Sequence, residues 1–228
     1  MSIGHILILL VSILGTPQNT WNGIWYRNHL CDNAQLVISP KSEDSFHFAI
    51  TAYSGALTGF IEGDAVINDD TAQWLMYEDG KKREIHFRYT DRGISITTKN
   101  CEGYYGAEGV IFDGEYTSYL ISEEKLADKW FENIINDMEM NQKIKKALGR
   151  SFVPFVYRLH LRFTEKSLDT FKATVISGCV TGLCDSAAAI IMITQQKHFY
   201  IAWLEDGLIY YYTSDDTYKQ KLPITISK

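Results

Sequence analysis

The sequence predicts an α+β protein, in which an N-terminal antiparallel β-barrel-like domain is followed by helices and a second antiparallel sheet. Residues 21–120 contain short runs with the two-residue period of strands, and residues 122–149 change to a helical period. Apolar β-type runs then return from residue 171 onward. Helices followed by strands are typical of an α+β domain. We therefore expect two domains, at residues 21–120 and 121–228.

The N-terminal domain is predicted from alternation of apolar and polar residues. In the run 46–52 every second residue is apolar, and the same pattern recurs at 85–89 and 94–96. Turn signals such as Asp79-Gly80 separate the runs. Several short strands at this spacing indicate a small meander barrel or sandwich.

The helical segment is recognised by apolar residues that repeat every four positions. These residues are Leu126, Trp130, Ile134 and Met138. Ser122 is the expected N-cap and Gly149 the expected C-cap. Asn136-Asp137 is expected to divide the segment into two helices, and a third short helix is predicted at 153–160.

The second sheet is predicted from four β-type runs and their turns. The runs cover 171–177, 187–194, 199–204 and 208–213, with a further edge strand expected at 222–226. The turn signals at 195–197 and at Asp206-Gly207 make this segment an antiparallel meander.

The N-terminal residues resemble an export signal. The run IGHILILLVSIL, residues 3–14, contains no Lys or Arg and is too short to span a bilayer, which takes about 20 residues. It matches the apolar region of a secretory leader. We therefore predict a signal peptide at residues 1–20, no membrane anchor, and a periplasmic or secreted location. The alternative is a buried N-terminal strand.

The chain contains four cysteines, an even number that suits an exported protein. Three pairings are possible. The short spacing between Cys179 and Cys184 makes that disulfide the easiest to form, and this leaves Cys31 to pair with Cys101.

The segment between the two close cysteines is the candidate functional site. Apolar β-type runs flank it, so a disulfide would fix it as a rigid tip that loses little entropy when it binds a partner. The alternative is a staple that only protects a hairpin. The candidate partner-binding loop comprises Cys179, Val180, Thr181, Gly182, Leu183 and Cys184.

Composition and motifs limit the function further. A net charge of −6 argues against a nucleic-acid partner and favours a basic protein partner. The sequence has no HExxH or CxxC motif, so no metal or other cofactor is expected. Asp113 and Glu115 lie too close together in the chain to flank a glycosidic bond as a catalytic pair. We therefore expect a protein that is not an enzyme.

Glycines and aromatic residues in the N-terminal half resemble a known barrel module. This half is similar to the β-barrels of membrane-bound inhibitors of C-type lysozyme and related envelope proteins. The matching patterns are Trp21-x-Gly23-x-Trp25, Gly59-x-x-x-Gly63-x-Ala65, Cys101-x-x-Tyr104-x-Gly106 and Phe112-Asp113-Gly114-x-Tyr116.

The C-terminal half resembles the periplasmic inhibitor of vertebrate lysozyme. It contains ALGRSFVPFV from Ala147, VISGC from Val175 and CDSAAAIIMI from Cys184, in the order of that family. In the family, the loop Cys-Lys-Pro-His-Asp-Cys enters the lysozyme cleft and its His contacts the catalytic carboxylates. Here Gly182 holds the position of that His. The resemblance therefore supports the fold and a protruding loop more than it supports lysozyme as the target.

Together these observations predict a non-catalytic secreted protein that binds and inhibits a lysozyme or another cell-wall hydrolase through the loop 179–184. One alternative is an immunity protein against a toxin delivered by a competitor. Others are a lipocalin-like binder of a small apolar ligand and a structural envelope protein whose domains only pack.

Overall fold

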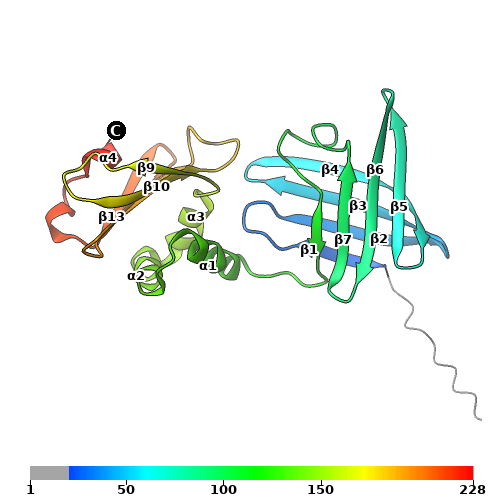
Figure 1. The fold of residues 1–228 in the computed structure, drawn as a ribbon, viewed down its shortest axis with the longest axis horizontal. Helices are drawn as coiled ribbons and strands as arrows, with labels where there is room; N and C mark the ends of the chain where they lie inside the picture. Colours follow the sequence, from blue (N-terminus) through cyan, green and yellow to red (C-terminus); the bar gives the residue numbers. More distant parts are fainter. Residues whose placement is uncertain (1–20, 228) are drawn as a thin grey trace, which may run out of the picture.

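A computed structural model describes residues 21–227 of the chain; the predicted signal peptide lies outside the described residues. The predicted α+β class is confirmed. An eight-stranded antiparallel sheet, nearly closed into a barrel, is followed by helices and a five-stranded antiparallel sheet (Figure 1). The change from strands to helices falls between residues 116 and 123.

The barrel is an antiparallel meander in which neighbours along the chain are neighbours in the sheet. Its strands are β1 Gly23–Arg27, β2 Ala34–Ser42, β3 Ser45–Ser54, β4 Leu57–Asn68, β5 Thr71–Glu78, β6 Lys81–Thr90, β7 Gly93–Lys99 and β8 Gly114–Tyr116. A bridge between Tyr26 and Thr117 brings the last strand back beside the first.

The barrel interior is filled with side chains. The strands alternate as predicted, so Phe46, Phe48 and Ile50 of β3 point inward while His47 is exposed. The hydroxyl of the buried Tyr116 donates a 2.7 Å hydrogen bond to the carbonyl of Phe112. Further buried aromatic residues of this core are Trp21, Trp25, Trp74, Phe87 and Phe112. The interior is therefore a packed core.

Three helices connect the two sheets: α1 Glu123–Ile134, α2 Met138–Leu148 and α3 Phe152–Tyr157, the last preceded by the 3₁₀ turn η1 Gly149–Ser151. The predicted break between α1 and α2 is confirmed, because the Asp137 carboxylate accepts a hydrogen bond from the amide of Met140 and caps α2. Gly149 ends α2 with a φ of 52°. Ser122 occupies the N-cap position of α1, but within the described residues its side chain makes no capping hydrogen bond.

The second sheet has the order β13-β12-β11-β10-β9. Its strands are β9 Leu161–Lys166, β10 Ala173–Cys179, β11 Ala188–Thr194, β12 Phe199–Glu205 and β13 Leu208–Thr213. One face packs against the helices through Ile191, Ile201 and Trp203. The opposite face, called the outer face below, buries Val175 and Tyr200 beneath Phe171 and the C-terminal residues.

The chain end is helical, not the edge strand predicted at 222–226. The 3₁₀ turn η2 Asp216–Tyr218 precedes the short helix α4 Ile224–Ser227. The carboxylate of Asp169 accepts the amides of Ile224 and Thr225 at 2.8 and 3.1 Å and so caps the first turn of α4. This cap comes from a residue more than fifty positions upstream, so local sequence could not indicate it. Strand β9 was not predicted either.

The disulfide predicted between Cys31 and Cys101 is not formed in the structure, whereas the one between Cys179 and Cys184 is. Cys31 belongs to the core around the helices and lies 3.9 Å from the carbonyl oxygen of Tyr157, whereas Cys101 belongs to the barrel core. The chain after β1 turns Cys31 away from the barrel, so the two thiols lie in different cores. Burial raises the pKa of Cys31 to about 12.

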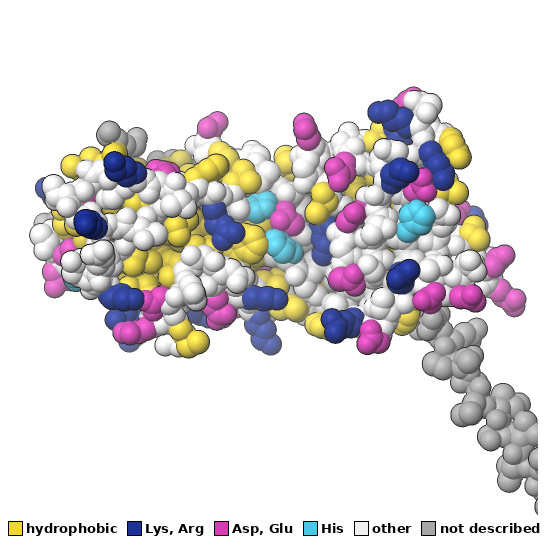
Figure 2. Space-filling model, viewed as in Figure 1, with side chains coloured by type: hydrophobic (Ala, Val, Ile, Leu, Met, Phe, Trp, Pro, Cys, Tyr) yellow, Lys and Arg dark blue, Asp and Glu magenta, His cyan; other side chains and the backbone are white. Residues whose placement is uncertain are grey.

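The surface differs between the two halves. In the view of Figure 2, hydrophobic side chains gather on the C-terminal domain, whereas charged side chains are spread over the barrel.

No helix among residues 21–227 is long and apolar enough to cross a membrane. Within the same residues, no group of three or more His, Cys, Asp or Glu side chains is placed to hold a metal ion.

We predict that Gly63→Ala destabilises the barrel, because a Cβ at residue 63 would lie 2.7 Å from Cδ1 of the buried Trp74. Displacing a packed indole typically costs about 1–3 kcal/mol. The midpoint of urea unfolding should fall accordingly. Glu62→Ala changes the neighbouring outward-facing residue and should leave the midpoint nearly unchanged; equal midpoints for the two variants would contradict this packing argument.

Candidate functional site

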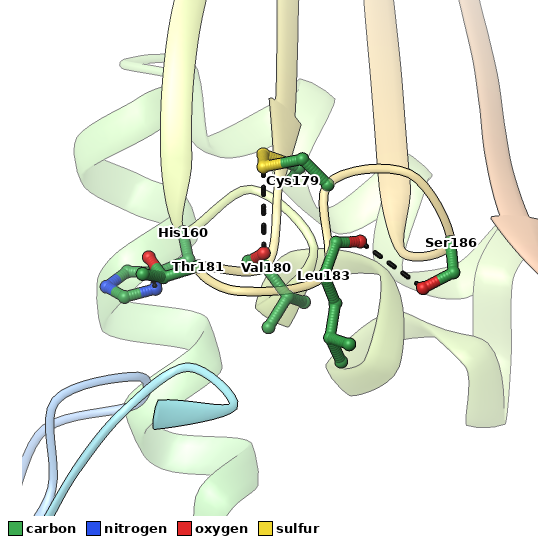
Figure 3. The surroundings of a disulfide bond; sticks show 7 residues. His160, Cys179, Val180, Thr181, Leu183 and Ser186 are labelled. Atoms are coloured by element: carbon green, nitrogen blue, oxygen red, sulfur yellow. Dashed lines mark hydrogen bonds between the residues drawn. A yellow bond between two sulfur atoms is a disulfide. The ribbon is translucent and has the colours of Figure 1, made fainter. Parts of the chain in front are cut away.

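The predicted loop follows the end of β10 and is closed by its disulfide (Figure 3). Hydrogen bonds within it run from the amide of Leu183 to the carbonyl of Val180 at 2.9 Å, and from the amide of Ala187 to the carbonyl of Leu183 at 2.8 Å. Gly182 takes a φ of 84°, a left-handed conformation that favours glycine. The loop is therefore a compact turn.

The six loop residues lie together but differ in exposure. Cys179 and Val180 are buried and Thr181 is half-buried. Leu183 is 44% exposed, so it is the large apolar side chain that the loop presents to solvent.

One side of the loop is docked on the barrel, at the turn between β3 and β4. The amide of Ala56 donates a 3.0 Å hydrogen bond to the carbonyl of Thr181. A Cβ added to Gly55 would lie 2.8 Å from that same oxygen, and one added to Gly182 would lie 3.0 Å from Leu57. The predicted rigid tip is therefore only partly exposed, because Thr181 and Gly182 face the chain's own first domain.

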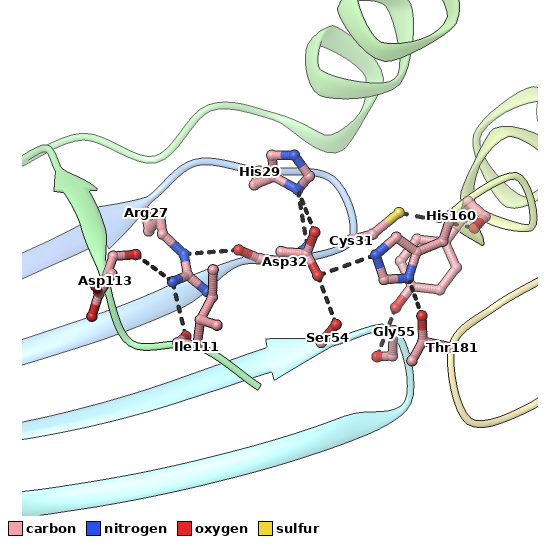
Figure 4. A network of polar contacts seen from close by, with 11 residues as sticks. Arg27, His29, Cys31, Asp32, Ser54, Gly55, Ile111, Asp113, His160 and Thr181 are labelled. Carbon is pink, nitrogen blue, oxygen red and sulfur yellow. Dashed lines mark hydrogen bonds and ion pairs between the residues drawn. The ribbon is translucent and has the colours of Figure 1, made fainter. Parts of the chain in front are cut away.

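A buried histidine completes this contact between the domains (Figure 4). The His160 side chain is 8% exposed; its Nδ1 lies 2.9 Å from Oγ1 of Thr181 and its Nε2 lies 3.1 Å from Oδ1 of Asp32. The hydroxyl of Ser54 donates to the same carboxylate oxygen at 2.8 Å. We call His160, Asp32, Ser54 and Thr181 the junction network.

Two residues hold the surroundings of the junction network in place. The hydroxyl of Tyr157, at the end of α3, donates to the carbonyl of Gly55 at 2.9 Å. On the barrel side, Arg27 donates to the carbonyls of Asp32, Ile111 and Asp113 at 2.7 to 2.9 Å. The Asp32 backbone is thus fixed from within the barrel, while its side chain reaches the second domain.

The ionisation of the junction follows from burial and hydrogen bonds. Burial raises the pKa of Asp32, but hydrogen bonds from His160 and Ser54 outweigh it, so this pKa lies below its usual value. Burial lowers the pKa of His29 against the opposing effect of the Asp32 carboxylate. Nδ1 of His29 accepts the amide of Asp32 at 3.0 Å, which requires the neutral imidazole.

An apolar groove on the outer face of the second sheet continues from the loop. Its volume is about 400 Å³, and the disulfide forms part of its wall. Small residues such as Ser177, Ala188 and Ala202 lie between the larger Phe163 and Ile209. Through its disulfide the loop therefore borders a surface suited to apolar contacts.

A second depression, of about 760 Å³, lies on the barrel wall and is lined by polar residues that include Asp64, His86 and Arg88. The Asp64 carboxylate is paired with Lys41 at 2.5 Å and with His47 at 3.0 Å. Its charge is therefore already compensated within the chain.

Sequence reasoning found the loop but missed the junction network. Asp32 and His160 are 128 positions apart, and no spacing pattern connects them. The turn at Ser54-Gly55 carries the loop's docking site, and its local sequence gives no sign of this.

Comparison with protein-family models, with curated proteins and with solved structures found no match to this chain.

We predict that His160→Ala loosens the loop, because it leaves the half-buried Asp32 carboxylate and the Thr181 hydroxyl without this partner. Removing one partner of such a contact typically costs about 1–3 kcal/mol. Hydrogen exchange should become faster at the amide of Ala56, whose acceptor is Thr181. His47→Ala, on the exposed barrel wall, is the matched control; unchanged exchange at Ala56 in His160→Ala would contradict the role assigned to the network.

Stability should also depend on pH through His29. Because its pKa is lowered from 6.5 in the folded chain, the unfolded chain binds a proton first as the pH falls. The contribution of His29 to the free energy of unfolding is therefore complete above about pH 6.5. It is lost as the pH falls toward the pKa of His29 in the folded chain. Between about pH 7.5 and 5, the unfolding free energy of the unaltered chain should fall more steeply than that of His29→Asn; equal slopes would show that His29 does not titrate differently on unfolding.

Proposed function

We propose that the protein is a non-catalytic inhibitor that binds a lysozyme or another cell-wall hydrolase through the outward side of the loop 179–184. The observation that carries this proposal is the position of Leu183. Its side chain is exposed, while the loop backbone behind it is fixed by a disulfide and by the barrel.

The fixed backbone supports a binding role for energetic reasons. A loop that is already ordered loses little conformational entropy when a partner binds, so more of the contact free energy appears as affinity. The disulfide restrains the loop from the sheet side, and the hydrogen bond from Ala56 restrains Thr181 from the barrel side.

The side of contact differs from that of the family that the C-terminal half resembles. Gly182, at the position of that family's His, faces Leu57, and Thr181 is engaged with His160. A partner would instead meet Leu183 and the exposed Cys184. The contact would therefore be mainly apolar, whereas the acidic net charge of −6 would draw a basic enzyme toward the protein at long range.

The other predicted functions differ in how well the geometry suits them. An immunity protein against a delivered toxin would use the same surface, and only the target distinguishes it. A lipocalin-like function is less favoured, because aromatic side chains such as Phe48, Phe87 and Trp74 occupy the barrel interior. A purely structural role would also account for the docking of Thr181, and the inhibition measurement below distinguishes it from binding.

We predict that Leu183→Asp weakens inhibition. Placing a carboxylate in an apolar contact removes the burial of one leucine, worth roughly 1.5–3 kcal/mol, which is about a tenfold to hundredfold loss of affinity. The measurement is the inhibition constant against a panel of C-type lysozymes and bacterial muramidases, with stability checked by urea unfolding.

The matched control is Leu168→Asp, because Leu168 is 49% exposed and lies beyond the opposite end of β10. This variant should inhibit as the unaltered chain does. The proposal fails if no hydrolase in the panel is inhibited, or if both variants lose inhibition equally.

A further inference from the structure

Strand β9 is the most exposed strand of the second sheet. All of its residues, Leu161 to Lys166, are solvent-exposed, and the described residues place no strand beyond it. Such an edge presents unpaired backbone N–H and C=O groups that can pair with another strand. Two apolar side chains accompany them, Phe163 at 58% and Leu161 at 40% exposure.

The opposite edge of the sheet is formed by β13. On β13, Tyr210 and Tyr212 stack on the buried Trp203, with ring centroids 5.2 and 5.6 Å away. Phe163 has no described aromatic neighbour of this kind. Leu208 and Ile209 of β13 are also exposed, at 61% and 62%, but of the two edge strands β9 alone is exposed at every residue.

Phe163 also connects this edge to the apolar groove. It pairs across the sheet with Ser177, which pairs with Ile190, and Ile190 pairs with Ala202. These four residues form one row on the outer face, and all of them line the groove. A strand added beside β9 would extend that row.

We propose that β9 pairs antiparallel with β9 of a second copy of this chain, so that the two five-stranded sheets become one continuous sheet. The two-fold axis of such a dimer is perpendicular to the sheet, which keeps each outer face on the same side. Directly opposed residues then point to the same face, so one residue of β9 lies opposite its own copy and the axis passes midway between the two copies.

The charges of β9 select the register. An axis at Arg162, Glu165 or Lys166 places that charged residue opposite its own copy, and an axis at Thr164 places Arg162 opposite Lys166. Like charges that are directly opposed are destabilising. An axis at Leu161 would overlap the two strands at that residue alone. An axis at Phe163 pairs residues 161–165 and avoids opposed like charges, since it places Arg162 opposite Thr164.

This register brings the two copies of Phe163 face to face on the outer face of the sheet. Leu161 of each copy then lies opposite Glu165 of the other, whose carboxylate accepts a hydrogen bond from the hydroxyl of Ser177 in its own sheet. The grooves of the two copies meet at the Phe163 pair. An aromatic pair in the centre of the contact contributes packing that the single chain leaves exposed.

The test is the oligomeric state of the purified full chain, measured by sedimentation equilibrium at micromolar concentrations. We expect a monomer–dimer equilibrium, and Phe163→Lys should raise the dimer dissociation constant about tenfold or more, because it opposes two ammonium groups and removes the aromatic pair. Leu168→Lys, at a similarly exposed leucine outside β9, should leave the equilibrium unchanged. Urea unfolding identifies any variant that fails to fold.

The register is tested separately by cysteine cross-linking. Phe163→Cys should give a disulfide-linked dimer under mild oxidation, and Tyr212→Cys, on the opposite edge, should not. A chain that remains monomeric throughout the concentration range overturns the proposal, including the case in which β9 instead takes an extended segment of another protein. A dimer that persists in Phe163→Lys, or that cross-links through residue 212 and not through residue 163, overturns it as well.

Discussion

The contact of His160 with Asp32 and Thr181 fixes how the two domains meet. Each partner comes from a different part of the chain: Asp32 from the β1–β2 connection, His160 from the end of the helical segment, and Thr181 from the disulfide loop. A buried imidazole placed between a carboxylate and a hydroxyl is satisfied at both nitrogens. Moving either domain would leave a buried polar group unpaired, which is costly in a desolvated site.

This junction shows how the disulfide acts on the loop 179–184 in the folded chain. The disulfide closes only a short segment, so its effect on the unfolded chain is smaller than that of a long closure. Its larger effect is geometric, because it holds Thr181 where the amide of Ala56 and the ring of His160 can reach it. Restraining one side of the loop leaves the other side, with Leu183, ordered and exposed.

The barrel is closed, whereas the second sheet is open and only partly covered. In the barrel, the apolar faces of the strands close around an aromatic core, and the outer wall carries charged pairs such as Lys41 with Asp64. The second sheet is open, so its outer face is covered only in part, by Phe171, η2 and α4, and it retains an apolar groove and an exposed edge. Both proposed contacts lie on the C-terminal domain, although the barrel wall also exposes apolar side chains such as Phe60 and Val66.

The sequence by itself determined the fold class and most of the elements. Alternation identified β3 and β6, the four-residue repeat identified α1, and Asn136-Asp137 identified the break before α2, because each signal depends on neighbours within a few residues. The spacing of Cys179 and Cys184 likewise identified their disulfide.

Local patterns do not encode which distant segments meet. The tertiary structure decided this. It separated Cys31 from Cys101 by placing them in different cores, and it made the chain end helical through the cap from Asp169. It also turned Thr181 and Gly182 toward the barrel. These outcomes depend on hydrogen bonds and packing between residues many positions apart, whose energies are set only when both segments are in place.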